Sequence, residues 1–375
     1  MKKYRVVIIG FAHMHINDVA RSFFDCPSMD IVACADTPCP DAKALASPYT
    51  RNWNKSFCVK QFHIPRVYED YCTMLDQEHP DLAIVTCENS LHLPVVRECA
   101  RRGISVSVEK PMATSYSAAF EMARSVQENG VHLMINWPIA WEPVYLKMKS
   151  MAEQGAIGRI LQMRIRTSHA GPLGTGVRHK GVSEVARPLT GEEKGMTWWH
   201  QERKGGGAML DFCSYGSLLS RWFIGKDAVE VMGMAANLNS TYGDANDNAA
   251  MLVRYPDALA IIEGSWTSPH EFYPCDFPVL YGTSGIMTIE RDKGVKVLLN
   301  AETSPRVYTA DAPLEGYSIA YAWQHKLQTG SAPFELLDIP LNIAAMQILD
   351  AGVRSAKSGR AEPLDASALR EVVAE

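Results

Sequence analysis

The residues whose types and spacing could do chemistry lie in two stretches. In the first, Glu109-Lys110-Pro111 follows the run Ile104 to Val108, which predicts a buried strand. Pro111 cannot continue a ladder, so an acid and a base stand at the strand's carboxyl end, where open parallel sheets bind ligands. A strand ended by a solvated ion pair would explain the same residues. On these residues alone, the two interpretations are equally good.

The second stretch is a predicted helix, 208–223, preceded by three glycines at 205–207. Asp211 and Tyr215 are four residues apart, so both project from one helix face. A carboxylate and a phenol reached through glycines suit a site that a ligand or backbone approaches closely. The alternative is an aspartate that favours the helix dipole and a tyrosine used for packing, and without context it is slightly the better interpretation.

The first element that could position these groups is the apolar strand 5–10, followed by a predicted helix from Ile16 to Phe24. Between them a dinucleotide fingerprint is degraded to Gly10-x-Ala12-x-x-His15. Gly10 can make the tight turn, and Ala12 is small enough to let a pyrophosphate approach. His15 replaces the glycine that allows close packing, so the helix must sit differently or His15 must face the site.

A second predicted strand, 31–36, ends in Asp36, 26 residues after Gly10. An acid near this offset meets the ribose hydroxyls of a dinucleotide and favours NAD, since a 2′-phosphate would be repelled. An aspartate that starts the turn Asp36-Thr37-Pro38 is the alternative. Residues 48–66 have no clear period and are predicted to form a loop over the ribose side.

A third predicted strand, 82–85, is followed by Thr86 and then by Asn89 and His92, at the same carboxyl edge. His92 is more commonly a packing residue at a helix start than a catalyst. A helix over 93–102 leads to the strand before Glu109.

The order of elements predicts an α/β fold: an N-terminal doubly wound parallel sheet (1–136), then an α+β domain on an open, mostly antiparallel sheet (137–336). A C-terminal helix in 337–375 is expected to pack back on the first domain. The long glycine-rich, basic stretch 168–204, with Trp198 and Trp199, is expected to be functional, for example as a lid.

Composition excludes several classes of function. Of 375 residues 47% are hydrophobic and 21% charged, and a net charge of -5 argues against a nucleic-acid partner. The apolar run 5–12 is too short for a membrane span or a signal peptide, so we expect a cytoplasmic protein without membrane attachment. Nine cysteines at irregular spacings predict reduced thiols and no metal site.

Taken together, these segments resemble the glucose-fructose oxidoreductase / inositol dehydrogenase (Gfo/Idh/MocA) family. The resemblance is collinear over nearly the whole chain. It rests on Thr86 to His92 (the family's Thr-Pro-Asn-x-x-His), Glu109-Lys110-Pro111, Gly155-x-x-Gly158-x-Ile160, Gly205-Gly206-Gly207-x-x-x-Asp211 and Gly282-x-x-Gly285.

The family implies an NAD(P)-dependent oxidoreductase of sugars, cyclitols or related polyols. Its N-terminal domain is a Rossmann domain, and its C-terminal open sheet often mediates dimers or tetramers. By this resemblance Lys110 lies near the substrate hydroxyl or carbonyl, Asp211 is the motif aspartate, and Tyr215 takes the place commonly held by a catalytic histidine. This chain departs from the family at Ala12 and His15, at Glu88 in place of proline, and at Cys213 and Leu218.

The predicted site therefore has catalytic residues Lys110, Tyr215 and Asp211, with Tyr215 as acid/base and Lys110 polarising the reacting oxygen. We expect the two side chains to tune each other, because an ammonium favours tyrosinate and desolvation lowers a lysine pKa. NAD is expected rather than NADP, in a homodimer or homotetramer. The predicted cofactor contacts are Gly10, Ala12, His13, Met14, Asp36, Thr86, Asn89, His92, Glu109 and Lys110.

Two other functions remain open at this point. The degraded phosphate loop and the absent histidine also suit a non-catalytic regulator that binds nucleotide and sugar. A glycosidase that uses bound NAD transiently, with no net redox change, is the third possibility.

Overall fold

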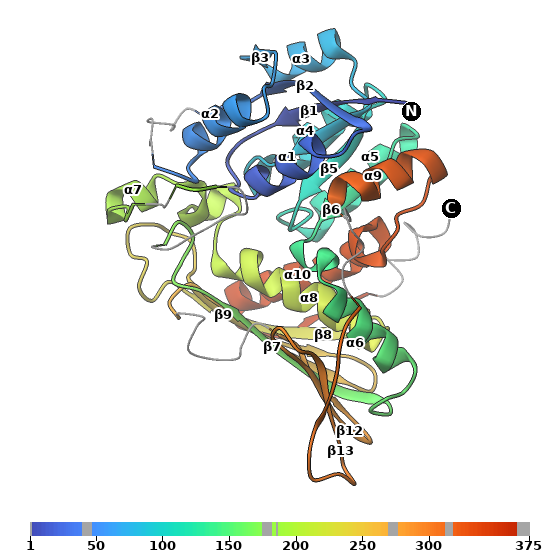
Figure 1. Cartoon of the computed structure of the whole chain (residues 1–375). Helices are drawn as coiled ribbons and strands as arrows, with labels where there is room; N and C mark the ends of the chain where they lie inside the picture. The colour runs from blue at the N-terminus through green and yellow to red at the C-terminus, as the bar shows by residue number, and fades with distance from the viewer. Residues whose placement is uncertain are drawn as a thin grey trace.

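A computed structural model of the chain describes residues 2–39, 47–174, 182–184, 187–268, 277–311 and 318–365. Two domains lie one above the other (Figure 1). The upper domain holds the N-terminal segments, and the lower is built on a broad sheet. Helices from the C-terminal part of the chain lie beside both. The predicted α/β class with two such domains is confirmed.

The upper sheet is parallel throughout, with strand order β3-β2-β1-β4-β5-β6. Every connection between neighbouring strands must therefore cross over the sheet, and the predicted strand–helix alternation supplies the helices that do so. The strands are β1 (Tyr4–Ile9), β2 (Met29–Ala35), β3 (Val67–Tyr68), β4 (Leu82–Val85), β5 (Ser105–Glu109) and β6 (Leu133–Asn136). Their carboxyl ends form one edge, which faces the lower domain.

The prediction of a loop over 48–66 is wrong, because Arg51–Gln61 forms a helix. Only Asn54 and Cys58 of this helix are buried, so its apolar face is too narrow for a periodicity signal. Trp53 and Phe57 stack one turn apart with ring centroids 4.8 Å from each other. The helices of this domain are α1 (Ile16–Phe24), α2 (Arg51–Gln61), α3 (Tyr71–Glu78), η1 (Asn89–Leu91), α4 (His92–Ala100) and α5 (Tyr116–Glu128).

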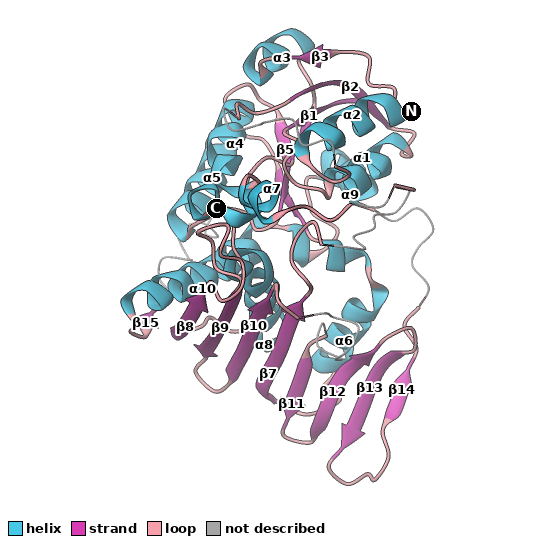
Figure 2. Ribbon diagram, turned by 90° about the vertical axis from the view of Figure 1, so that its left-hand side faces the viewer, coloured by secondary structure: helices cyan, strands magenta, loops and turns pink. Residues whose placement is uncertain are grey.

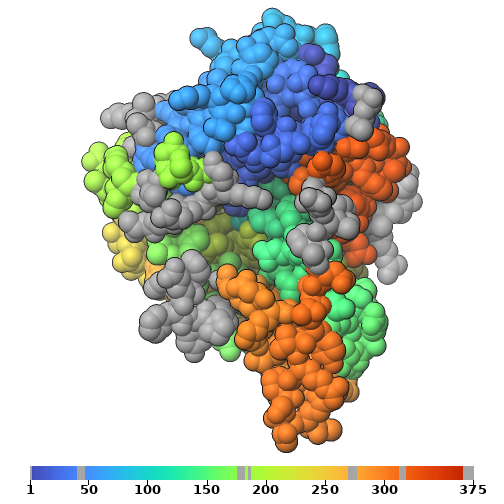
Figure 3. Space-filling model, in the orientation of Figure 1, coloured from blue at the N-terminus to red at the C-terminus, as the bar shows by residue number. Residues whose placement is uncertain are grey.

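The lower sheet has nine strands in the order β14-β13-β12-β11-β7-β10-β9-β8-β15. It is antiparallel except at its centre, where β7 and β10 pair in parallel. The hairpin of β12 and β13 reaches away from the rest of the molecule (Figure 3). The strands are β7 (Ile160–Ser168), β8 (Glu230–Ala236), β9 (Asn248–Arg254), β10 (Leu259–Ser265), β11 (Val279–Gly282), β12 (Gly285–Glu290), β13 (Gly294–Leu299), β14 (Arg306–Tyr308) and β15 (Glu362–Pro363).

Helices cover one face of this sheet and leave the other without any described helix (Figure 2). The predicted C-terminal helix is α10, which packs on β8 and α8 and also contacts α5 of the upper domain. No helix among the described residues combines the length and apolar character needed to cross a bilayer. The helices are η2 (Pro138–Trp141), α6 (Pro143–Glu153), α7 (Gly191–Gly195), η3 (Trp198–His200), η4 (Glu202–Lys204), η5 (Met209–Cys213), α8 (Ser214–Ile224), α9 (Ile319–Thr329), η7 (Glu335–Leu337) and α10 (Ile339–Ser358).

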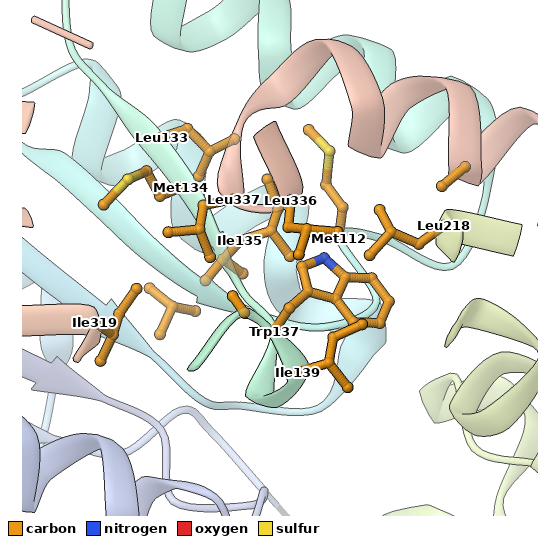
Figure 4. Packing of buried hydrophobic residues seen from close by; sticks show 14 of the residues in the cluster. Met112, Leu133, Met134, Ile135, Trp137, Ile139, Leu218, Ile319, Leu336 and Leu337 are labelled. Carbon is orange, nitrogen blue, oxygen red and sulfur yellow. The ribbon is translucent and has the colours of Figure 1, made fainter. Parts of the chain in front are cut away.

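A continuous apolar core joins the two domains around Trp137 (Figure 4). The indole is 2% exposed, and its Nε1 donates to Asn342 Oδ1 of α10 at 2.7 Å. Leu336 and Leu337 pack beside it. A buried tryptophan of this kind contributes about 3–5 kcal/mol relative to alanine. The carboxyl edge of the upper sheet is therefore fixed against the lower domain.

Candidate active site

Lys110 and Asp211 form a buried ion pair between the two domains. Lys110 follows the end of β5 and is 2% exposed, whereas Asp211 lies in η5 and is 8% exposed. The Lys110 ammonium donates to Asp211 Oδ1 at 2.6 Å and to the Asp211 carbonyl oxygen at 3.2 Å. Trp266 Nε1 donates to the other carboxylate oxygen at 3.1 Å. Each charge thus has a partner within the interface.

Tyr215 completes this cluster. The Lys110 ammonium lies 4.6 Å from the centroid of the Tyr215 ring, which is a cation–π distance. Trp137 packs against the same ring in a T-shaped arrangement, with centroids 5.2 Å apart. The structure therefore brings together the three side chains that the sequence nominated for catalysis, from β5 of one domain and η5–α8 of the other.

The electrostatics of the cluster overturn one expectation. Burial alone would lower the pKa of Lys110, but Asp211 outweighs it and the pKa is raised above its ordinary value. Burial likewise opposes ionisation of Asp211, yet Lys110 and His169 hold its pKa below the usual range. Burial raises the pKa of Tyr215 to about 12, with Lys110 opposing the shift. The resting site thus holds an ammonium, a carboxylate and a neutral phenol. The two effects expected of the pair are present, but burial of Tyr215 and the charge of Asp211 outweigh them, so neither pKa moves toward neutral pH.

Three glycines let backbone segments close around Asp211. A side-chain carbon on Gly206 would collide with the carbonyl oxygen of Trp199, and Gly205 has a φ of +80°. Asn89 Nδ2 donates to the Gly205 carbonyl at 2.8 Å. Asn89, predicted as a cofactor contact, therefore fixes the glycine segment, which begins the helix that carries Asp211.

Sequence reasoning missed Trp266 and His169. The parallel pairing of β7 and β10 sets Ser168 opposite Ser265, so the residues that follow both strands lie side by side. The His169 amide donates to the Ser265 carbonyl at 3.1 Å. A sheet taken as antiparallel would have placed these two chain ends apart. The signal that could have found them is an aromatic or titratable residue directly after each of two apolar strands.

The glycine loop after β1 has the form that a dinucleotide site needs. Gly10 has a φ of +85°, and a side chain there would collide with Cys87. Thr86 Oγ1 donates to the Gly10 carbonyl at 2.7 Å, and the His13 amide donates to the Thr86 carbonyl at 3.0 Å. Gly10 and Thr86 therefore shape the loop, as expected for neighbouring strand ends.

The same loop offers donors for an anion. Among the described residues, the amides of Ala12 and Met14 make no hydrogen bond, and both precede the amino end of α1, which favours negative charge. Trp198 covers the loop by donating from Nε1 to the Ala12 carbonyl at 2.9 Å. Ala12 also lines a pocket together with Thr50 and Arg51. This donor set fits the pyrophosphate of a dinucleotide.

His15 was not predicted as a contact, yet it faces the site. Its Nδ1 lies 2.9 Å from Glu109 Oε1, and Asn136 Nδ2 donates to the other Glu109 oxygen at 2.8 Å. Burial would raise the pKa of Glu109, but His15 and Lys110 lower it below its ordinary value. Ligand atoms of His13, His15 and Glu109 lie within 4.8 Å of one another, close enough for a metal ion. The His15–Glu109 contact accounts for this cluster without one.

Two predicted contacts remain, Asp36 beside the loop, where its Oδ1 accepts from the Phe11 amide at 3.3 Å, and His92. Asp36 directly follows β2, and Arg51 Nη1 donates to its Oδ1 at 2.7 Å. Burial raises the pKa of Asp36, and Arg51 opposes the shift. His92 is fully buried, with Nδ1 3.2 Å from the Met112 carbonyl oxygen, and burial lowers its pKa. His92 therefore supports the turn after Lys110 from behind.

Comparison with known proteins gives two family matches. Residues 4–137 match an oxidoreductase family with an NAD-binding Rossmann fold, and residues 145–288 match the GFO/IDH/MocA C-terminal domain. Inositol 2-dehydrogenase 2 of Saccharopolyspora erythraea is 29% identical over 155 residues, 39% of this chain and 46% of that protein. Trans-1,2-dihydrobenzene-1,2-diol dehydrogenase of Mus musculus is 23% identical over 233 residues, 62% of each chain. The chain thus matches less than two thirds of the length of either relative.

The similarity of fold to solved structures extends over nearly the whole chain. The crystal structure of an aldose-aldose oxidoreductase from Caulobacter crescentus, complexed with glycerol, superimposes with a TM-score of 0.73 at 20% identity. That superposition covers 97% of this chain and 100% of the other.

Proposed function

Because the chain belongs to the Gfo/Idh/MocA family of oxidoreductases, we propose that it is an NAD(P)-dependent dehydrogenase of a secondary alcohol on a sugar, cyclitol or related polyol. The observation that carries this proposal is the Lys110–Asp211–Tyr215 cluster. It lies at the carboxyl edge of the upper sheet, the edge from which the glycine loop also projects. NAD is the proposed cofactor, since Asp36 directly follows β2, where a ribose 2′-hydroxyl would be bound.

When bound, the nicotinamide would supply the hydride chemistry, and the protein must position the substrate and manage one proton. We assign Lys110 to polarise the reacting oxygen, because its ammonium keeps its proton throughout the ordinary pH range. Asp211 holds that ammonium in place and can accept a hydrogen bond from a substrate hydroxyl. Tyr215 donates the proton when a carbonyl is reduced, and its phenolate takes the proton when an alcohol is oxidised.

The activity test is NADH absorbance with a panel of polyols, sugars and sugar acids, offered with NAD and NADP separately. Net NADH accumulation on at least one substrate supports a dehydrogenase. Release of sugar from a glycoside without net NADH would instead indicate the glycosidase. Binding of nucleotide with neither product would indicate the regulator, and either of these results contradicts the proposal.

The residue assignment is tested with Lys110→Met and Tyr215→Phe, each expected to lower kcat by about 10²-fold or more. The chain offers matched controls for both. Lys149 also lies over an aromatic ring, 5.6 Å from the Trp222 centroid, and Tyr255 is a buried tyrosine whose hydroxyl donates to Ser220. Lys149→Met and Tyr255→Phe should retain turnover in the fraction that folds. Near wild-type kcat in both site variants would overturn the assignment.

A further inference from the structure

We infer that Glu88 decides which dinucleotide this chain accepts, because it holds Arg51 against Asp36 and away from any phosphate on the adenosine ribose. The inference rests on the proposed function, since it concerns the cofactor cleft of the same site. Glu88 stands where the family motif has proline, and its carboxylate is 3% exposed. A carboxylate buried this deeply must have a partner that stabilises its charge.

That partner is Arg51. Arg51 is the first residue of α2, and its guanidinium lies between two carboxylates. Nη1 donates to Asp36 Oδ1 at 2.7 Å and to the Thr37 carbonyl oxygen at 3.3 Å, while Nη2 forms an ion pair with Glu88 Oε1. Thr37 Oγ1 donates to the second Glu88 oxygen at 3.4 Å. Nη1 is thus held by hydrogen bonds, whereas Nη2 is buried and is held by its ion pair with Glu88.

Asp36 is oriented by the same contacts. Its Oδ1 accepts from the amides of Phe11, at 3.3 Å, and Thr37, at 2.9 Å, as well as from Arg51. Within the described ranges, its Oδ2 accepts no hydrogen bond, and the Asp36 side chain is 18% exposed. One carboxylate oxygen is therefore fixed by three donors, and the other can accept a hydrogen bond from a ribose 2′-hydroxyl.

A 2′-phosphate would ordinarily be bound by an arginine near this position, since the planar guanidinium fork matches phosphate oxygens. Here Arg51 would first have to release Glu88. That release would leave the buried Glu88 carboxylate with the Thr37 hydroxyl as a donor but without its counter-charge, which is unfavourable. The competition between Glu88 and a phosphate for the same guanidinium therefore disfavours NADP, in addition to the repulsion from Asp36.

A second cation also lines this pocket. Lys204 does so together with Arg51 and Glu88, and its Nζ lies 4.0 Å from the Cys39 sulfur. Lys204 is therefore the alternative determinant of cofactor choice. Its contribution can be separated from that of Glu88 by substitution.

The experiment measures dissociation constants of NAD and NADP for the purified full-length chain by tryptophan fluorescence. Wild-type protein should prefer NAD. Glu88→Gln should shift the ratio toward NADP by about tenfold or more, the effect of one freed charged hydrogen-bond donor. Adding Arg51→Met to Glu88→Gln should cancel the shift. Glu98→Gln, on the outer helix α4, is the control and should leave the ratio unchanged.

Glu88→Pro is a second variant that tests the same inference if Glu88→Gln does not fold. Glu88 has a φ of −61°, close to the value that proline fixes, and its amide makes no hydrogen bond among the described residues. This variant should therefore fold and show the same shift toward NADP. The melting temperature of each variant is measured alongside.

An unchanged ratio in folded Glu88→Gln and Glu88→Pro proteins, with NAD still bound by the wild type, would overturn this inference alone. A shift produced by Lys204→Met but not by the Glu88 variants would also overturn it. If wild-type protein bound neither dinucleotide, the proposed function would fail and this inference with it.

Discussion

At the scale of single residues, Lys110 keeps its charge because Asp211 lies 2.6 Å away. Asp211→Asn should therefore destabilise the chain by about 3–5 kcal/mol, since it leaves a buried ammonium without its counter-charge. Urea unfolding followed by circular dichroism measures the loss. Lys110→Met added to Asp211→Asn should restore part of the stability. A loss below about 1 kcal/mol in the single variant would mean that the pair is hydrated in solution.

The raised pKa of Tyr215 predicts how the rate of the proposed reaction depends on pH. With its pKa raised to about 12, the phenol is neutral at physiological pH, and the phenolate fraction grows about tenfold per pH unit. The kcat/KM for alcohol oxidation should therefore rise steadily from pH 7 to 10, and Tyr215→Phe should remove that rise. Carbonyl reduction, which uses the protonated phenol, should stay nearly constant over the same range. An oxidation profile that levels off by pH 8 would contradict the role of Tyr215.

The sequence indicated which residues form the site better than it indicated their protonation states. Lys110, Asp211 and Tyr215 could be nominated because strand ends and helix periodicity are local properties of the sequence. The protonation states could not, because each depends on how deeply the interface buries the group and on which partner it meets there. Trp266 was missed and the partner of His15 was not foreseen for the same reason, since these contacts join distant segments.

At the scale of elements, helix α1 begins and ends at the residues predicted for the helix that follows the first strand and its glycine turn. Helix α2 was not predicted, because it buries only two of its residues. The parallel pairing of β7 with β10 could not be read from the sequence either, since both strands alternate as antiparallel strands do. Long-range pairing depends on which strands meet, and that is decided by the whole sheet.

The glycine segment before η5 gives a prediction at this scale. Gly206→Ala should lower stability by about 1–3 kcal/mol and reduce turnover, because the new methyl group collides with the Trp199 carbonyl and displaces the start of the helix that carries Asp211. Gly130→Ala is the control: its φ of +63° makes alanine strained, but no atom lies within 4 Å. It should lose stability without losing turnover of the folded protein. Equal turnover in both variants would mean that the segment tolerates the shift.

At the scale of the whole molecule, the open face of the nine-stranded sheet presents large apolar side chains. Met234 is 72% exposed, Leu252 55% and Leu259 48%, from three adjacent strands. Contiguous exposed apolar residues of this kind mark interaction surfaces. They support the expectation of a homodimer or homotetramer that buries this face.

Leu252→Lys combined with Met234→Glu should therefore convert the protein to a monomer, measured by light scattering after size-exclusion chromatography. Phe24→Glu is the matched control, because Phe24 is 43% exposed on α1 of the upper domain, away from the sheet. It should leave the mass unchanged. A wild-type protein that is already monomeric at high concentration would contradict the prediction.

The π-helical turn at Met209–Cys213 has a consequence for how this chain tolerates changes of length. Such a turn holds one residue more than an α-helical turn, and one residue corresponds to about 100° of rotation. Deleting a single residue between Asp211 and Tyr215 would keep all the chemical groups of the site but turn the phenol away from Lys110. Relatives that differ here by one residue would thus lose the arrangement without any substitution at Lys110, Asp211 or Tyr215.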